Sequence, residues 1–337
     1  MSRTIFGSYF RQAESTITVP KFMAGGQIVS DDASTPLRSS HNPAELNQVG
    51  VVILSFSRTM VPNVLSLHSR LVAAGAAVVV VANSASCWDL LSEADIGAVT
   101  AFHNGGFSVG MNFGVKELRR IDRTLQWFVL LNDDADIPDV YAFARINGLN
   151  SRIVSYSPDK VLVIPTTGSI LRSFAMVPPR YHSVPHGQQD VAIPSDCYCA
   201  FSAVGIHVTL WDELGGLDES FPFTYEDADF SRRASNRNEI TVLVAESDRA
   251  VHIRGESGRF HVAEVLPVST ASALRYLDNI GHLTVLTRLA IILCLIIRIP
   301  LTPFSRASRL PHLRGIIRAI GVVLGAFQPM LPEFDAV

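Results

Sequence analysis

The residues best suited to chemistry are carboxylates in a short acidic turn, Asn132-Asp133-Asp134-Ala135-Asp136. The turn directly follows an apolar run that is typical of a buried strand. Ligands of open α/β sheets bind at the carboxyl ends of strands, and three carboxylates this close repel one another unless a cation neutralises them. Oxygen ligands suit Mg²⁺ or Mn²⁺. The turn therefore predicts a metal site that could hold a diphosphate, the alternatives being a solvated acidic loop or a cap for a helix near Pro138.

A second acidic group lies further along the chain, in Tyr225-Glu226-Asp227-Ala228-Asp229. A carboxylate at the start of a helix, presented to a cleft, can act as a general base. The same residues also have a structural interpretation. Thr224 and Asp227 have the spacing of a capping box, and Asp229 and Arg233 have the i, i+4 spacing of a helical ion pair. The structural interpretation accounts for every charge in this segment, and the two interpretations stay open as alternatives.

A segment rich in glycine and asparagine runs from Asn104 to Gly114. Its spacing matches neither the Walker loop nor the G-x-G-x-x-G dinucleotide motif. Glycines let the backbone approach a ligand closely. The segment is therefore either a ligand-binding turn or a tight turn before a closely packed helix. His252, at the end of a short apolar strand, is either a structural residue or a ligand.

Strands and helices must position these groups, and the hydrophobic pattern predicts where they lie. In the first half, buried strands are predicted at 49–56, 77–82, 97–102 and 126–132, with helices at 62–74 and 107–118. Such alternation is typical of an α/β domain with a mostly parallel sheet. In the second half, shorter strands are predicted at 160–165, 197–204, 240–245 and 250–253, and helices at 208–214 and 225–235. After about residue 269 the pattern is helical, with breaks at Pro300, Pro303 and Pro311.

Composition excludes several classes of protein. The 337 residues carry a net charge of −3, whereas a dedicated nucleic-acid binder usually has a basic excess. Four cysteines in so long a chain do not form a disulfide framework and are expected to be reduced. No secretory signal is visible, and the longest apolar run, Leu289–Ile297, is too short to cross a bilayer. These features predict a cytoplasmic protein.

The charge is unevenly distributed. Between Arg275 and Arg318 there are seven arginines and one acid, Asp278, so this segment carries +6 and the remainder −9. Basic amphipathic segments bind anionic membrane surfaces. We therefore expect the protein to lie peripherally on the inner face of the plasma membrane. The alternatives are a helical cap on the core and a homo-oligomer interface.

Together these segments resemble family 2 glycosyltransferases of the GT-A fold, especially bacterial rhamnosyltransferase-like members. The resemblance covers about residues 50–258, and its motifs occur in the family's order. Asn104-x-Gly106-Phe107 with Gly110, Asn112 and Gly114 is similar to the family's Asn-x-Gly-Phe…Gly-x-Asn-x-Gly segment. Leu130-Leu131-Asn132-Asp133-Asp134 is similar to Leu-Leu-Asn-Pro-Asp, and Gly215-Gly216-Leu217-Asp218-Glu219…Tyr225-Glu226-Asp227-x-Asp229 to Gly-Gly-Phe-Asp-Glu…Tyr-Glu-Asp-x-Asp. His252 falls where the family has a histidine.

The resemblance implies a Rossmann-like GT-A domain with a mostly parallel sheet at residues 49–268. An irregular extension, 1–48, would precede it and a basic helical segment, 269–337, would follow. The implied activity is metal-dependent, inverting transfer of a sugar from a nucleotide-diphosphate donor to a lipid-linked or polysaccharide acceptor. Rhamnose from dTDP-rhamnose is the expected donor, and another hexosyl or galactofuranosyl donor carried on UDP is the alternative.

The resemblance also implies roles for individual residues. Asp227 would be the general base, with Glu226 and Asp229 positioning that site. Mg²⁺ or Mn²⁺ would be held by Asp134, Asp136 and His252. The donor would lie against Ser55, Asn83, Asn104, Gly106, Asn112, Asp133 and Asp134.

The chain departs from the family pattern at three places. Ala82-Asn83 stands where the second strand usually ends in Asp-Asn, so the nucleotide preference is open. Asp133 replaces a proline, which leaves open which of the three aspartates in the turn bind metal. Cys199-Ala200 replaces a Gly-Ala pair, so the acceptor pocket is expected to differ. The lost carboxylate at Ala82 motivates a second hypothesis, a non-catalytic subunit that binds nucleotide or glycan.

Overall fold

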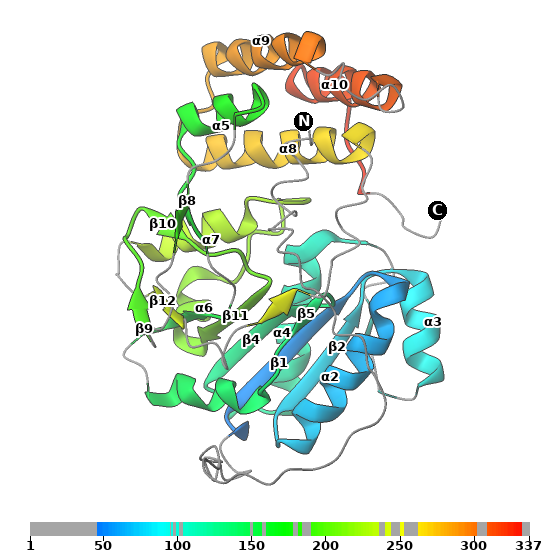
Figure 1. Cartoon of the computed structure of the whole chain (residues 1–337), viewed down its shortest axis with the longest axis vertical. Coiled ribbons are helices and arrows are strands. Elements are labelled where there is room, and N and C mark those ends of the chain that lie inside the picture. The colour runs from blue at the N-terminus through cyan, green and yellow to red at the C-terminus, as the bar shows by residue number, and fades with distance from the viewer. Residues whose placement is uncertain are drawn as a thin grey trace, which may run out of the picture.

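The computed structural model describes residues 46–94, 96, 99–100, 104–148, 151–156, 160–177, 181–183, 190–235, 240–243, 250–252, 262–301 and 309–331. The predicted irregular extension lies outside these residues except for its last three. The described chain forms a lower α/β body and an upper helical layer (Figure 1).

An eight-stranded sheet forms the centre of the body, in the order β3-β2-β1-β4-β11-β6-β12-β9. Its strands are β1 (Val49–Ser55), β2 (Ala77–Ala82), β3 (Val99–Thr100), β4 (Trp127–Asn132), β6 (Ile153–Ser155), β9 (Asp190–Ala192), β11 (Ala203–His207) and β12 (Ile240–Leu243). All but β11 and β9 run in one direction. The predicted fold class, α/β with a mostly parallel central sheet, is confirmed.

Continuous apolar runs form the central strands because both faces of the sheet are covered. β1 is buried at every position. Helix α2 (Val61–Ala73), which follows the short 3₁₀ turn η2 (Arg58–Met60), packs beside α3 (Ala85–Glu93). Helix α4 (Gly106–Ile121) packs on β1 and β2. A Cβ atom at Gly110 would collide with Leu54, and one at Gly114 with Val52. These two glycines therefore serve close helix–sheet packing.

The remaining elements of the body are short. They are the 3₁₀ segment η3 (Val140–Gly148), helices α6 (Val208–Leu214) and α7 (Glu226–Ser235), and strands β5 (Ala135–Asp136), β7 (Lys160–Val163), β8 (Tyr181–Ser183), β10 (Cys197–Tyr198) and β13 (Val251–His252). β10, β7 and β8 form one small sheet, and β13 pairs with β5. The helices predicted at 208–214 and 225–235 are confirmed to within one residue.

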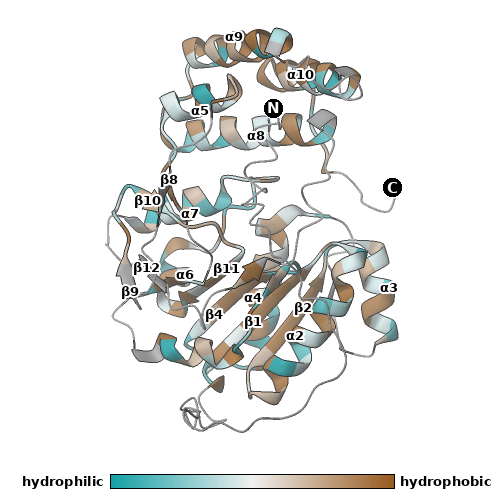
Figure 2. Cartoon of the chain, in the orientation of Figure 1, coloured by the Kyte–Doolittle hydropathy of each residue, from teal (hydrophilic) through white to brown (hydrophobic). Residues whose placement is uncertain are grey.

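The upper layer contains α5 (Thr167–Phe174), α8 (Val262–Asn279), α9 (Val285–Leu301) and α10 (Arg309–Val323). Their facing side chains form one apolar core, which also includes Tyr198, Phe221 and Ala228 of the body. α9 ends at Leu301, one residue after the predicted break at Pro300, whereas the predicted break at Pro311 is wrong because this residue lies in the first turn of α10. The predicted boundary at 268/269 falls inside α8. None of the helices in the described part of the chain combines the length and apolar character needed to cross a membrane. Figure 2 shows apolar residues along most of α9.

Candidate functional site

The carboxyl ends of β1, β2 and β4 meet at one edge of the sheet, where the sequence analysis places the donor. Ser55 ends β1 and its carbonyl accepts a hydrogen bond of 2.8 Å from the backbone N–H of Asn83, just after β2. The Ser55 side chain is fully buried, and its Oγ makes no hydrogen bond with any described residue. Asp133 and Asp134 follow β4 directly and are both buried. The predicted donor residues of these three strands are therefore neighbours.

Asp133 holds the loop that follows β1. Its Oδ2 accepts hydrogen bonds of 2.7 Å from the backbone N–H groups of Phe56 and Ser57. Burial raises the pKa of this carboxyl to about 6, although the two hydrogen bonds act in the opposite direction. Asn63 of α2 donates to the carbonyls of Asp133 and Ala135. The acidic turn is thus rigidly attached to β1 and α2.

Asp134 and Asp136 have different surroundings. Asp136 is partly exposed and forms an ion pair with Arg70 of α2, which also donates to the carbonyl of Ile137 over 2.6 Å. Asp134 is only 8% exposed and lies at the strand end. β13 pairs with β5 so that His252 stands opposite Ala135 in the backbone register, while its side chain lies outside the described structure.

The described residues contain no group of three or more His, Cys, Asp or Glu side chains arranged to hold a metal. Mg²⁺ commonly binds through one or two carboxylates, waters and substrate phosphates rather than through an all-protein cage. A buried carboxylate at a strand end fits this pattern of binding. The metal ligands of the sequence analysis, Asp134, Asp136 and His252, stay a prediction.

The glycine-rich turn lies between the strand ends and the second acidic group. Asn104 Oδ1 accepts hydrogen bonds of 3.0 Å from the Asn83 side chain and from the Gly106 backbone N–H. Gly106 has a φ of +83°, and a Cβ atom there would lie 2.5 Å from the carbonyl oxygen of Pro222. A glycine is needed here both for the backbone conformation and for this close approach. Three of the predicted donor residues therefore belong to one hydrogen-bonded turn.

The side chain of Asn112 makes hydrogen bonds within the protein. Its side-chain amide donates to the Leu217 carbonyl over 2.9 Å and accepts from the Leu217 N–H over 3.1 Å. It also donates to Glu219. These bonds attach α4 to the loop that follows Gly215 and Gly216, so the structure shows a positioning contact for this predicted donor residue.

The backbone before α7 is strained. Thr224 and Tyr225 both have left-handed φ values, +69° and +70°, which cost free energy for residues other than glycine and occur most often at functional sites. The capping box considered for Thr224 is wrong, because its Oγ1 makes no hydrogen bond with any described residue. The first helical hydrogen bond instead runs from the Asp229 N–H to the Tyr225 carbonyl over 2.8 Å.

Glu226 and Asp227 follow this strained pair as the first residues of α7. Burial, together with the neighbouring charge of Asp227, raises the pKa of Glu226 to about 8. Burial raises the pKa of Asp227 to about 6, opposed by hydrogen bonds from the backbone of Ala228, Asp227 and Phe201. The two carboxyl groups share their environment, so they titrate as a pair. Burial therefore favours the protonated form of both carboxyl groups, more strongly for Glu226 than for Asp227.

The two acidic groups lie on opposite sides of one short segment. The backbone of Phe201 hydrogen-bonds to the Asp227 carboxyl. The next residue, Ser202, accepts a hydrogen bond of 3.0 Å from the N–H of Asn132, at the end of β4. Asp133 and Asp134 follow Asn132. The fold therefore brings the start of α7 to the same sheet edge as the acidic turn, although about 90 residues separate them in sequence.

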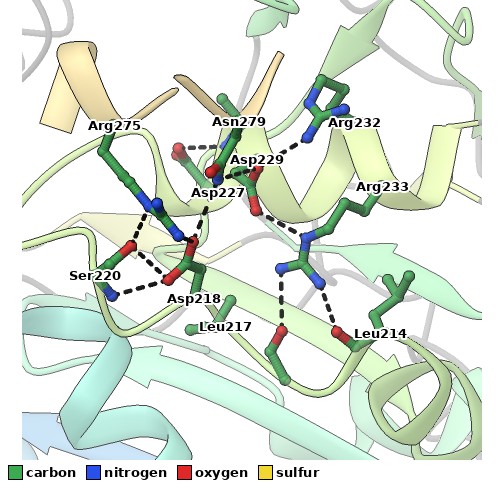
Figure 3. A network of polar contacts seen from close by, with 12 residues as sticks. Leu214, Leu217, Asp218, Ser220, Asp227, Asp229, Arg232, Arg233, Arg275 and Asn279 are labelled. Atoms are coloured by element: carbon green, nitrogen blue, oxygen red, sulfur yellow. Dashed lines mark hydrogen bonds and ion pairs between the residues drawn. The ribbon is translucent and has the colours of Figure 1, made fainter. Parts of the chain in front are cut away.

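Asp229 is the centre of a polar network (Figure 3). Its two carboxylate oxygens contact Arg232 at 3.1 Å and Arg233 at 2.8 Å, and Asn279 of α8 donates to it over 3.3 Å. Arg233 also donates to the carbonyls of Leu214 and Gly216. The predicted i, i+4 pair with Arg233 is confirmed. With its oxygens occupied in this way, Asp229 fixes α7, the helix that begins with Glu226 and Asp227, against its neighbours. Its positioning of the site stays a prediction.

Replacing Asp229 with alanine should lower the free energy of unfolding by about 3 kcal/mol, because it leaves two arginines without their buried partner. Urea denaturation measures this loss. Asp212→Ala removes an exposed aspartate paired with Arg119 and should cost less than about 1 kcal/mol. Equal effects of the two substitutions would contradict the structural role of Asp229.

Helix α8 braces the same region from the upper layer. Ser272 Oγ donates to the Phe223 carbonyl over 2.6 Å and accepts from the Phe223 N–H over 3.3 Å, directly before the strained pair. Arg275 donates hydrogen bonds to the side chains of Ser220 and Asp218.

The sequence analysis did not identify Asn63, Arg70, Ser272 or Asn279, because their partners lie 49 to 72 residues away. A local pattern gives no signal for contacts of that kind.

An α/β domain with two carboxylate groups at one sheet edge is typical of an enzyme that binds a charged ligand there. No family model matches the chain. Over 206 residues it is 26% identical to the low-salt glycan biosynthesis hexosyltransferase Agl10 of Haloferax volcanii, and the match covers 57% of this chain and 63% of that protein. The chain thus spans less than two thirds of the length of this curated relative.

Two solved structures are also similar. Residues 1–349 of Staphylococcus aureus TarS match with a TM-score of 0.42 and 12% identity, covering 82% of this chain and 90% of that one. The 4-diphosphocytidyl-2C-methyl-D-erythritol synthase of Anaerococcus prevotii matches with a TM-score of 0.35 and 13% identity, covering 68% and 98%.

Proposed function

We propose that this protein is an inverting, metal-dependent glycosyltransferase that moves a sugar from a nucleotide-diphosphate donor to an acceptor hydroxyl. The observation that carries the proposal is the half-buried pair Glu226 and Asp227, held at the start of α7 beside the strand ends that bear Asp133 and Asp134. The similarity to a hexosyltransferase supports glycosyl transfer in general.

In this proposal the two acidic groups have separate tasks. Asp227 accepts the proton of the acceptor hydroxyl while the acceptor oxygen bonds to the anomeric carbon. The bond between that carbon and the donor's phosphate oxygen breaks, and the diphosphate leaves with the bonding electron pair. Attack from the face opposite the leaving group inverts the anomeric centre. Burial raises the pKa of Glu226 more than that of Asp227, which favours Asp227 as the ionised member of the pair.

Asp134 is the best candidate ligand for Mg²⁺ or Mn²⁺. Asp134 is buried, only 8% exposed, and lies at the end of β4 between Asp133, which accepts from two backbone N–H groups, and Asp136, which pairs with Arg70. When bound, the ion would neutralise negative charge on the departing diphosphate. Asp136 and His252 would complete the site from the paired strands β5 and β13. The nucleotide would lie along Ser55, Asn83 and Asn104.

For the donor we propose a class of sugar nucleotide and, within that class, a particular sugar. A hexose on a nucleotide diphosphate is favoured by the hexosyltransferase relative, and rhamnose from dTDP-rhamnose is the finer expectation of the family resemblance. A UDP-hexose or UDP-galactofuranose is the alternative, because Ala82 removes a carboxylate that family members use near the nucleotide. The acceptor would be a lipid-linked or polysaccharide glycan.

The direct test is release of nucleoside diphosphate from a panel of dTDP-, UDP- and GDP-sugars, with Mn²⁺ or with chelator present. We expect slow, metal-dependent hydrolysis of one donor, faster when a glycan acceptor is added. Binding of a nucleotide without turnover of any donor would instead favour the second hypothesis, a non-catalytic binding subunit, for which the alanine at position 82 is the motivating feature.

A further inference from the structure

The outer surface of α9 and α10 is unusually apolar for an exposed surface. Eighteen large hydrophobic residues of the described chain are exposed, and thirteen of them lie between residues 285 and 330. The most exposed are Met330 at 82%, Leu286 at 78% and Val285 at 73%. Since this segment makes up about a seventh of the chain, the exposed apolar residues are concentrated here rather than scattered.

The two helices are apolar on both sides. On the inner side of α9, Ile291 and Leu295 are fully buried in the core shared with α5, α8 and α10. On the outer side, Leu286, Leu289, Leu293, Ile296 and Ile297 recur at helical spacing and are 46–78% exposed. A surface helix normally has a polar outer face. The inner face of α9 already packs in this core. Covering the apolar outer face therefore requires contact with another surface.

The helix α10 continues this surface and adds positive charge. Leu313 and Ile317 are exposed, and Arg314 and Arg318 are exposed next to them. Arg288 of α9 donates to the Val323 carbonyl at the end of α10 over 2.8 Å, which fixes the two helices to each other. In Figures 1 and 2 these helices form the outermost layer, on the far side of α8 from the central sheet.

The charge in this region has one sign. Between residues 279 and 332 the sequence contains six arginines and no aspartate, glutamate or lysine. A two-fold symmetric dimer through this surface would bring the patch on one copy against the same patch on the other, and therefore arginine against arginine. Anionic lipid headgroups instead offer the opposite charge, and their acyl chains accept the leucine and isoleucine side chains.

We propose that the outer face of α9 and α10 docks the protein onto an anionic lipid surface, with the two helices lying in the plane of the headgroups. The exposed leucine and isoleucine side chains enter the boundary between headgroups and acyl chains, and Arg314 and Arg318 contact the phosphates. The proposal rests on the helical layer alone and holds whether or not the chain transfers sugars.

The test is flotation of the full chain with vesicles of phosphatidylcholine alone and of equal parts phosphatidylcholine and phosphatidylglycerol. We expect binding to the anionic vesicles that weakens as salt is raised. Each arginine near the surface contributes about a five-fold factor in partitioning. The pair Arg314→Gln and Arg318→Gln should therefore weaken binding to anionic vesicles about 25-fold.

Two further double variants test whether this face binds a lipid surface or a second copy of the chain. Leu286→Asn with Leu293→Asn should abolish binding to vesicles. Val72→Asn with Ile121→Asn, at exposed apolar positions on the α/β body, should leave binding unchanged. Light scattering should give a monomer without lipid. Absence of vesicle binding by the parent chain would overturn the proposal. A dimer of the parent chain that the Leu286 and Leu293 substitutions dissociate, and the control substitutions do not, would also overturn the proposal. It would identify a second copy of the chain as the occupant of this face.

Discussion

Replacing Asp227 with asparagine should lower the rate of sugar transfer by about 10²–10⁴-fold, the usual contribution of a general base. Asparagine has nearly the same shape but cannot accept the acceptor's proton. The hydrogen bond from the Ala228 N–H to Oδ1 can still form to the amide oxygen of asparagine. The measurement is kcat at saturating donor, with nucleotide binding checked separately on the same variant.

Two control substitutions show whether the loss of transfer rate is specific to Asp227. Glu226→Gln imitates the protonated form of Glu226, which burial favours, so it should lose far less activity than Asp227→Asn. Asp212→Asn, at an exposed carboxylate of the preceding helix, should be neutral. An Asp227→Asn enzyme with the parent rate would show that the base is another residue.

The dependence of the transfer rate on pH follows from the titration of Glu226 and Asp227. The base must be ionised to act, and burial raises the pKa of Asp227 to about 6. The rate should therefore rise with pH through about 6, and at pH 5 it should be about a tenth of its plateau, because one pH unit is a factor of ten in ionisation. A rate that is already maximal at pH 5 would contradict the assignment of Asp227.

Replacing Asp134 with alanine should remove the metal-dependent stabilisation by a nucleoside diphosphate. A ligand present at 100 times its Kd stabilises the folded protein by about 2.7 kcal/mol, which thermal denaturation detects as a higher Tm. We expect one of dTDP, UDP and GDP to raise the Tm of the parent chain in the presence of Mn²⁺. That rise should disappear in Asp134→Ala.

Two controls decide between the aspartates of the turn. Asp89→Ala, at an exposed position on α3, should keep the full metal-dependent shift. Asp136→Ala breaks the ion pair with Arg70 and should lower the starting Tm, and it should reduce the metal-dependent shift less than Asp134→Ala does. Loss of the shift in Asp136→Ala but not in Asp134→Ala would make Asp136 the principal metal ligand.

Much of the fold follows from local patterns in the sequence. The apolar runs that became β1, β2 and β4 and the amphipathic stretches that became α2 and α4 were predictable, because periodicity reflects which faces an element buries. Helix α3 was missed, since its nine residues bury only Cys87 and Leu91. Pro311 was interpreted as a break, yet it lies in the first turn of α10, where proline is tolerated.

The sequence alone placed the carboxylates at the end of one strand and the start of one helix, since a position within an element is a local property. Only the tertiary structure decided what each side chain does there. Asp133 bonds to backbone 76 and 77 residues away, Asn112 holds a loop 105 residues away, and Asp136 pairs with Arg70. Ser272 and Asn279 of the helical layer reach the start of α7, so a segment predicted to be separate is part of its support. Partners of this kind depend on how distant segments pack, and neither periodicity nor spacing encodes that packing.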